Sequence, residues 1–208
     1  WTDSVEKFER EMAEVFPRSV ELAKRWNLSS LVIFGFCKPG ATEENADLIS
    51  SDNPQQKANW VIDCLAEAAA KAEEAGLRLL IEPEPICWAD TGAATVNLIR
   101  QTGSTAISIN YDPCNVAWME RRDPIDEFDL VTPYIANVHI KDQLDAPRGS
   151  GMPTWVLPGK GMLDYQAHFT ALKNSGYHGA VSLEPHFPLT LDTLAQFKKE
   201  IERLWAAA

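Results

Sequence analysis

Short apolar runs alternate with amphipathic stretches along the 208 residues of this chain. Runs such as 31–36 and 77–81 are almost continuously apolar, which is typical of strands that are covered on both faces of a sheet. Between these runs, apolar residues recur every three or four positions, as on one face of a helix. Strands that alternate with helices predict βαβ units, and therefore an α/β fold with a parallel sheet.

The pattern predicts five strands, at residues 31–36, 77–81, 106–111, 135–140 and 180–183. It predicts helices at 5–26, from Asn53-Pro54 to Gly76, and at 92–101, 124–132, 164–174 and 191–205. Pro17 should kink the first helical segment or begin a second helix, because proline is disfavoured inside a helix. No linker or block of like charge interrupts the pattern, so residues 1–208 are expected to form one domain. The Gly- and Pro-rich stretch 145–161 is interpreted as a functional loop.

Four polar residues directly follow apolar runs: Glu82, Asp112, His139 and Glu184. In a parallel barrel the carboxyl ends of all strands open on the same face, so these side chains should converge there. Three carboxylates and one imidazole suit Mn²⁺, Mg²⁺, Co²⁺ or Zn²⁺ and leave positions for substrate oxygens. The sequence therefore predicts a divalent-metal site.

Each of these residues also has a structural explanation. A single carboxylate after a strand is often a helix N-cap or a loop charge, and a single histidine there is often a hydrogen-bonded loop residue. The repetition of the same placement in four βα units favours the metal site. Glu84 is the main alternative to Glu82, because it lies two residues further on and faces the same side.

The formal net charge is −11, from 19 basic and 30 acidic residues, which disfavours general binding to nucleic acid. No apolar run is long enough to span a membrane. His168 and His178 lie in or after a predicted helix and are expected at the surface. The cysteine spacing suits neither a structural zinc site nor a dense disulfide framework, which favours reduced thiols in a cytoplasmic protein. The cysteines are Cys37, Cys64, Cys87 and Cys114.

The four residues, together with the flanking NVHIKD, PGKGMLDY and GYHGAVSLEPH segments, resemble the sugar isomerase/epimerase family with a xylose isomerase-like TIM barrel. The resemblance runs from about residue 30 to the end of the chain. It implies that Glu82, Asp112, His139 and Glu184 bind one divalent metal ion. It also implies that Glu82 and Glu184 are the acid/base pair, which transfers a proton through a metal-bound cis-enediolate.

General chemistry is consistent with these implied roles. Abstraction of a proton next to a carbonyl needs a base on one face and an electrophile at the oxygen. A second carboxylate on the other face permits epimerisation. Other candidates for contact with substrate are Trp88 and Trp155, in loops after strands, and Lys141 and His186, each two residues beyond a candidate ligand. Asn115 stands where many family members carry a substrate-binding histidine, which leaves that contact in question.

The strand count differs from a complete barrel. The resemblance places Glu184 on the last of eight strands, whereas the sequence shows five, so a TIM (β/α)8 barrel lacking its first three βα units is expected. We interpret the chain as an N-terminally incomplete version of a longer protein. An open sheet would expose an edge strand and an apolar face unless another chain covers them, for instance in a homo-oligomer.

Several functions remain open on this scaffold. The first is an isomerase or epimerase of a sugar, a keto-polyol or a related hydroxy-carbonyl compound, with a small carbohydrate as its partner. The second is a lyase, such as an inosose or 3-dehydroshikimate dehydratase, because dehydration begins with the same proton abstraction. An apurinic-site endonuclease would need a histidine-rich three-zinc cluster, and the chain has four histidines. A non-catalytic scaffold is the fourth alternative.

Overall fold

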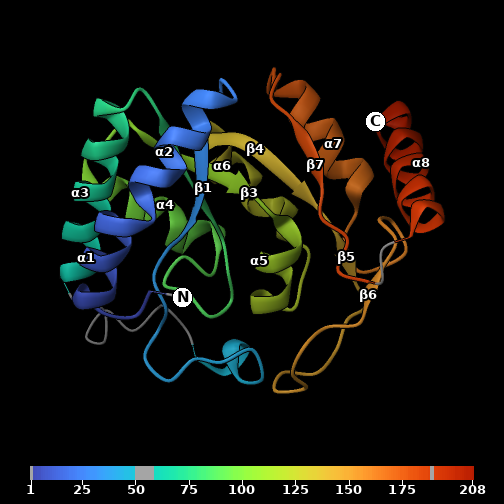
Figure 1. Ribbon diagram of the computed structural model, residues 1–208. Coiled ribbons are helices and arrows are strands. Elements are labelled where there is room, and N and C mark those ends of the chain that lie inside the picture. The colour runs from blue at the N-terminus through green and yellow to red at the C-terminus, as the bar shows by residue number, and fades with distance from the viewer. Residues whose placement is uncertain (1, 50–58, 188–189) are drawn as a thin grey trace.

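A computed structural model describes residues 2–49, 59–187 and 190–208. Its centre is a parallel sheet of five strands in the order β1-β2-β3-β4-β7 (Figure 1). In a short antiparallel pair, β6 lies within the segment predicted as a functional loop and β5 lies just before it. The five predicted strands are confirmed. The strands are β1 (Ser30–Phe34), β2 (Arg78–Glu82), β3 (Ile107–Tyr111), β4 (Ile135–Ile140), β5 (Asp142–Gln143), β6 (Trp155–Val156) and β7 (Val181–Leu183).

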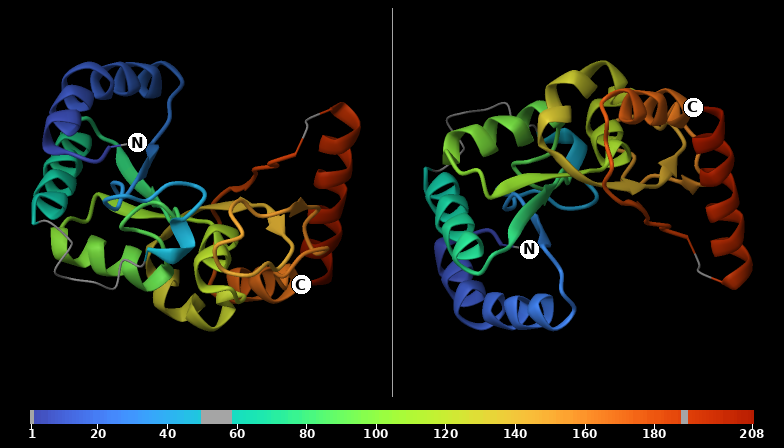
Figure 2. Two further views of the ribbon diagram at one scale, coloured as in Figure 1. Left: turned by 90° about the horizontal axis from the view of Figure 1, so that it is seen from below. Right: turned by 90° about the horizontal axis from the view of Figure 1, so that it is seen from above.

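Helices lie around the outer side of this sheet (Figure 2). Pro17 does begin a second helix, because α2 starts at Phe16 and carries proline in its first turn. The predicted start of a helix at Asn53-Pro54 lies outside the described residues. The α-helices are α1 (Val5–Glu14), α2 (Phe16–Arg25), α3 (Trp60–Glu74), α4 (Gly92–Thr102), α5 (Pro113–Glu120), α6 (Phe128–Val131), α7 (Tyr165–Asn174) and α8 (Leu191–Ala207). The 3-10 turns are η1 (Ala46–Leu48), η2 (Pro124–Glu127) and η3 (Thr132–Tyr134).

Helix α5 was not predicted. Residues 113–119 are all buried, so the helix has no polar face and lacks the periodicity that indicates an amphipathic helix. The local start signal is nevertheless present, because Asp112 is the N-cap and Pro113 occupies the first turn. The N-cap residue Asp112 followed by Pro113 is therefore the sequence signal by which this helix could have been predicted.

The surface position predicted for His168 is wrong. His168 lies on α7, and its side chain is buried, with Nδ1 3.1 Å from the Tyr111 hydroxyl and Nε2 2.7 Å from Asp123 Oδ1. Both ring nitrogens therefore have partners inside the protein, which allows a polar ring to be buried at low cost. His178 is exposed, as predicted.

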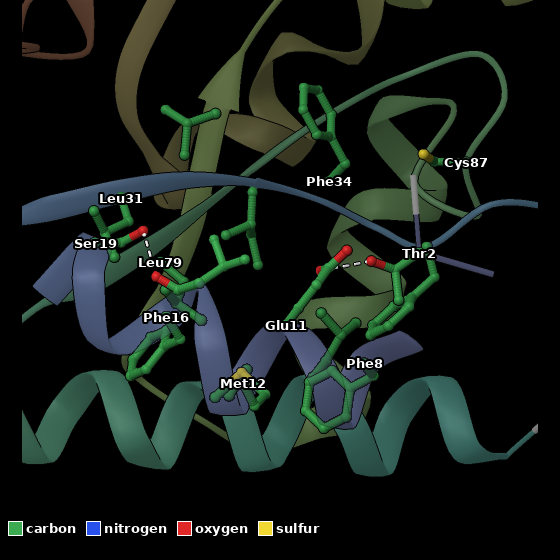
Figure 3. Close-up of a pocket in the computed structure, with 16 residues that line it drawn as sticks. Thr2, Phe8, Glu11, Met12, Phe16, Ser19, Leu31, Phe34, Leu79 and Cys87 are labelled. Carbon is green, nitrogen blue, oxygen red and sulfur yellow. Dashed lines mark hydrogen bonds between the residues drawn. The ribbon is translucent and has the colours of Figure 1, made fainter. Parts of the chain in front are cut away.

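The sheet remains open within the described residues, with β1 at one edge and β7 at the other. Figure 2 shows the resulting arc, which is open between the α1–α2 side and α8. At the β1 edge, Val32 and Phe34 are more than two-fifths exposed. An apolar hollow extends from β1 to α1, α2 and α3, with Phe8, Met12 and Phe16 along its wall (Figure 3). The open sheet expected from the strand count is thus present.

The core lies between the sheet and its helices and includes the fully buried Ile81, Ile109 and Phe169. In the part of the chain that the structure describes, no helix combines the length and apolar character that a membrane span requires.

Candidate metal centre

The four predicted ligands meet at the carboxyl end of the sheet. Glu82, Asp112, His139 and Glu184 each offer a ligand atom, and all four atoms lie within 4.8 Å of one another. His139 Nδ1 is 3.4 Å from Glu82 Oε1 and 3.3 Å from Glu184 Oε2. Four strands contribute to this cluster, because parallel pairing aligns their ends on one side.

Asp112 combines the structural and the functional interpretation of its position. Its Oδ1 accepts hydrogen bonds from the backbone N–H groups of Cys114 and Asn115, at 2.9 and 3.0 Å, and so caps α5. Its Oδ2 faces the cluster. The cap fixes the orientation of the carboxylate, because both bonds hold the same oxygen.

Glu82 is oriented by polar side chains that cross the sheet. Asn110 donates from Nδ2 to Glu82 Oε2 at 2.8 Å, and its Oδ1 accepts from Asn137 Nδ2 at 2.6 Å. Ser182 in turn donates to Asn137 Oδ1 at 3.4 Å. These residues come from β3, β4 and β7, and we refer to Asn110, Asn137 and Ser182 as the polar ladder. It holds Glu82 through Oε2, whereas Oε1 lies 3.4 Å from His139 Nδ1.

The polar ladder was not predicted, although its members share a pattern in the sequence. Each member lies two residues before a candidate ligand: Asn110 before Asp112, Asn137 before His139, and Ser182 before Glu184. Residues two apart on a strand face the same side, so each member lies one step below a ligand. A register shift between Ile109 and Asn110 sets the pairing of β3 with β4.

Lys141 lies within the cluster. Its Nζ is 2.6 Å from Asp112 Oδ2 and 2.5 Å from Glu184 Oε2, and the side chain is almost fully buried. Burial by itself would lower the pKa of Lys141, but the two carboxylates outweigh burial and raise it. Lys141 therefore remains charged and balances part of the negative charge of the site.

Charge in the cluster also affects its other members. Burial raises the pKa of Asp112 to about 6, although Lys141 opposes this shift. Burial would lower the pKa of His139, but its contacts with Glu184 and Glu82 raise it to about 10. The protonated imidazole cannot ligate a metal ion, so binding of a cation would release that proton.

Asn115 and Glu84 lie beside Glu82. Asn115 Nδ2 is 2.8 Å from the Pro83 carbonyl oxygen, 3.2 Å from Glu84 Oε2 and 3.5 Å from Glu82 Oε1. Burial raises the pKa of Glu84 to about 8, with Lys141 opposing the shift. Glu84 thus lies next to the cluster but is not among its four convergent residues.

An aromatic wall borders the cluster on the Glu184 side. The rings of Trp155 and His186 are 4.7 Å apart, and Trp118 meets Trp155 edge-on at 6.5 Å. We refer to Trp118, Trp155 and His186 as the aromatic wall. His186 Nε2 is 3.5 Å from Glu184 Oε1, so the aromatic wall lies directly beside the cluster. Trp88 is different, because only 3% of it is exposed and it packs within the core. This position shows Trp88 as a packing residue of the core, in place of the substrate contact suggested by the sequence.

The loop 145–161 is fastened at both ends. Asp142 Oδ2 accepts backbone hydrogen bonds from Gly159 and Gly161, each at 2.9 Å. A Cβ on Gly161 would lie 2.2 Å from Asp142 Oδ1, so this approach requires glycine. Nearer the start of the loop, the backbone N–H of Gly149 donates to Asp47 Oδ2 at 2.9 Å. The loops after β1 and β4 therefore meet at the end of the sheet that carries the cluster (Figure 1).

The residues present fit a divalent cation. Asp112 Oδ2 and His139 Nδ1 are buried and face the other candidate ligands, with Asp112 Oδ2 also 2.6 Å from Lys141 Nζ. Carboxylate oxygens and one imidazole are the donors that Mn²⁺, Mg²⁺, Co²⁺ and Zn²⁺ accept. A cation would also relieve the repulsion among three carboxylates whose ligand atoms lie so close together.

Comparison with solved structures shows the same fold. A xylose isomerase domain protein from Planctomyces limnophilus matches with a TM-score of 0.71 and 20% identity, over 89% of this chain and 61% of its own. An IOLI protein with a bound zinc atom matches with a TM-score of 0.76 and 23% identity, over 99% of this chain and 73% of its own. The 3-keto-D-glucoside 4-epimerase YcjR from E. coli matches with a TM-score of 0.64 and 17% identity, over 90% of this chain and 67% of its own.

The chain thus spans less than two thirds of the first of these structures. A comparison with curated protein sequences gave no match. A family profile described as xylose isomerase-like TIM barrel matches residues 2–206. This match covers nearly the whole chain, and the parallel sheet with ligand-type residues at its strand ends agrees with it. The chain belongs to the xylose isomerase-like TIM barrel family.

Proposed function

We propose that the protein is a divalent-metal-dependent isomerase or epimerase of a sugar, a keto-polyol or a related hydroxy-carbonyl compound. One observation carries the proposal: three carboxylates and one imidazole, from four strands, offer ligand atoms within 4.8 Å of one another. The zinc in the IOLI protein and the epimerase activity named for YcjR support it by analogy of fold.

In this proposal Glu82, Asp112, His139 and Glu184 hold the cation. When bound, the cation would polarise the carbonyl and hydroxyl oxygens of the substrate and stabilise negative charge on them. The polar ladder and the α5 cap keep the carboxylates of Glu82 and Asp112 in place. Such contacts to ligating groups commonly tune metal affinity.

Glu82 and Glu184 would move the proton. They lie on β2 and just after β7, separated in the sheet by β3 and β4, so they approach the cluster from two sides. One carboxylate takes the proton from the carbon next to the carbonyl, and the other returns a proton to the opposite face. Contacts with His139, His186 and Lys141 outweigh burial and lower the pKa of Glu184, which keeps it ionised.

The aromatic wall would face the carbon skeleton of the substrate. Trp155 offers a ring face on which the apolar side of a sugar can pack, and Lys141 lies 5.9 Å from the centre of that ring. Lys141, His186 and Asn115 supply polar groups around the same space. We assign no contact with substrate to Trp88, because the core covers it.

Metal binding is the first test, since it does not depend on a known substrate. The apo protein is titrated with Mn²⁺ and Zn²⁺, and bound metal is measured per chain. One ion per chain is expected, together with loss of binding in His139→Gln. Glu67→Gln is the matched surface control, because Glu67 is half exposed and forms an ion pair with Lys71 in the same helix. Absence of specific binding by the folded protein would refute the metal site.

The second test addresses the reaction. Metal-loaded protein is incubated in D₂O with a panel of ketoses and keto-polyols, and products are analysed by mass spectrometry. An isomerase or epimerase should introduce one deuterium at the reacting carbon, and Glu82→Gln and Glu184→Gln should abolish this exchange. A product lighter by one water would identify the lyase alternative. If no substrate exchanges while metal is bound, the proposed activity is wrong.

A further inference from the structure

We propose that Cys37 and Cys87 form a reversible disulfide, which fastens the loop after β1 to the loop after β2 at the rim of the candidate site. The proposal goes beyond the isomerase function and does not depend on it. It assigns a redox modification site to two thiols that the proposed reaction does not use.

The backbone places the two cysteines opposite each other. They form an isolated antiparallel bridge, flanked by a hydrogen bond from Lys38 N to Ile86 O at 2.9 Å and one from Trp88 N to Phe36 O at 2.8 Å. Because the bonds flank the pair, Cys37 and Cys87 occupy a non-hydrogen-bonded position, where facing Cα atoms are about 4.5 Å apart. That spacing falls within the range of about 4.4–6.8 Å found in disulfides.

The side chains are also suitably arranged. Cys87 is completely buried, and the Cys37 thiol beside it raises the pKa of its thiol. Cys37 is half-buried and lines a surface hollow with Lys7 and Lys38, which gives a small reagent access to it. The neighbouring Cys87 thiol lowers the pKa of the Cys37 thiol, which favours the nucleophilic thiolate.

The oxidant is a small-molecule disulfide of the glutathione class. The Cys37 thiolate attacks one sulfur of this disulfide, forms a mixed disulfide and releases one thiolate. Cys87 then attacks the sulfur of Cys37 and expels the second thiolate, which takes the proton that Cys87 loses. In sum, two protein thiols are oxidised to one disulfide, and one external disulfide is reduced to two thiols.

The bond would act on a segment next to the candidate metal centre. The backbone N–H of Cys87 donates to the Glu84 carbonyl at 2.8 Å, and that of Glu84 donates to the Ala89 carbonyl at 2.8 Å. The loop is therefore a tight turn that begins immediately after Glu82. Linking Cys87 to Cys37 would restrain this turn against the chain that follows β1, and reduction would release it.

The test uses the whole chain in glutathione buffers of graded redox ratio. Remaining thiols are alkylated, and tryptic peptides are analysed by mass spectrometry. Because Arg78, Arg100 and other basic residues separate them, the four cysteines fall on four different tryptic peptides, so each linkage has its own mass. We expect one linked pair, Cys37 with Cys87, with a mass lower by two hydrogens and full recovery of the thiols on reduction.

Variants distinguish this disulfide from nonspecific oxidation. Cys37→Ser and Cys87→Ser should each abolish the linkage, whereas Cys64→Ser, a buried position on α3, should leave it intact. The oxidised wild-type protein should also melt at a higher temperature than the reduced form, and this difference should vanish in Cys87→Ser. Linkage through Cys64 or Cys114, or only a stable mixed disulfide at Cys37, would overturn the proposal, as would fully reduced thiols in the most oxidising buffer while the protein stays folded.

Discussion

Substitution of Asn110 by alanine tests whether the polar ladder tunes the candidate metal centre. Asn110 is fully buried, donates to Glu82 Oε2 at 2.8 Å and accepts from Asn137 at 2.6 Å. A hydrogen bond to a charged group contributes about 1.5–3 kcal/mol. At about 1.4 kcal/mol for each factor of ten, its loss would weaken metal binding by roughly 10- to 100-fold. Asn115 still contacts Glu82, although at 3.5 Å, so a value near the lower end is expected.

The assay is competition for Mn²⁺ or Zn²⁺ against a chromogenic chelator, with urea unfolding measured in parallel. The variant should also lose about 1–3 kcal/mol of stability, because Asn137 Nδ2 loses its acceptor inside the protein. Asn97→Ala, at an exposed position of α4, is the matched control and should change neither quantity. Unchanged metal affinity in a folded Asn110→Ala protein would refute the role of the ladder, as would an equal loss in Asn97→Ala.

Three further predictions concern the loop, the buried histidine and the aromatic wall. Each oxygen of Asp142 accepts two backbone N–H groups, and Asp142→Asn replaces one oxygen by an NH₂ group, so urea unfolding should show a loss of about 2–6 kcal/mol. Asp145→Asn, in the exposed part of the loop, should change stability by less than about 0.5 kcal/mol. Burial by itself would raise the pKa of Asp123, but its hydrogen bond with His168 outweighs burial, so the pKa is lowered in the folded protein. The stability that Asp123 contributes is therefore present above its unfolded pKa of 3.8. It is lost as the pH falls through the lower folded value. The difference in unfolding free energy between wild type and Asp123→Asn should therefore disappear in acid, and a difference that grows in acid would contradict this sign. Once a substrate is known, Trp155→Ala should raise KM by about 2- to 10-fold, from the roughly 0.5–1.5 kcal/mol of ring packing, with kcat less affected and with rescue by Trp155→Phe.

The sequence predicted much of the fold because its strands and helices carry strong periodic patterns. All five strands of the sheet were found, and Pro17 correctly indicated the start of α2. The prediction failed for α5, whose residues are buried on every side, and for His168, whose surroundings come from distant parts of the chain. In both cases contacts between distant parts of the chain bury residues that a sequence pattern would place at the surface or could not assign to a face.

The candidate site was predictable to the extent that it depends on strand ends. Glu82, Asp112, His139 and Glu184 could be named because parallel strands bring their carboxyl ends to one side of a sheet. The sequence could not show that Lys141 would lie among these carboxylates or that the core would cover Trp88. Those positions depend on side-chain packing between elements.

The sequence by itself determined the alternation of strands and helices and the residue types at the strand ends, because both follow from spacings of two and 3.6 residues along the chain. Only the tertiary structure decided which side chains became lateral neighbours. The contact of Asn110 with Glu82 depends on the pairing of β2 with β3. The pairing of Cys37 with Cys87 brings together two loops whose cysteines are 50 residues apart in the sequence. The hydrophobic pattern fixes which face of each strand is buried. Which side chains of separate strands and loops then meet depends on how those elements pack against one another in the whole molecule.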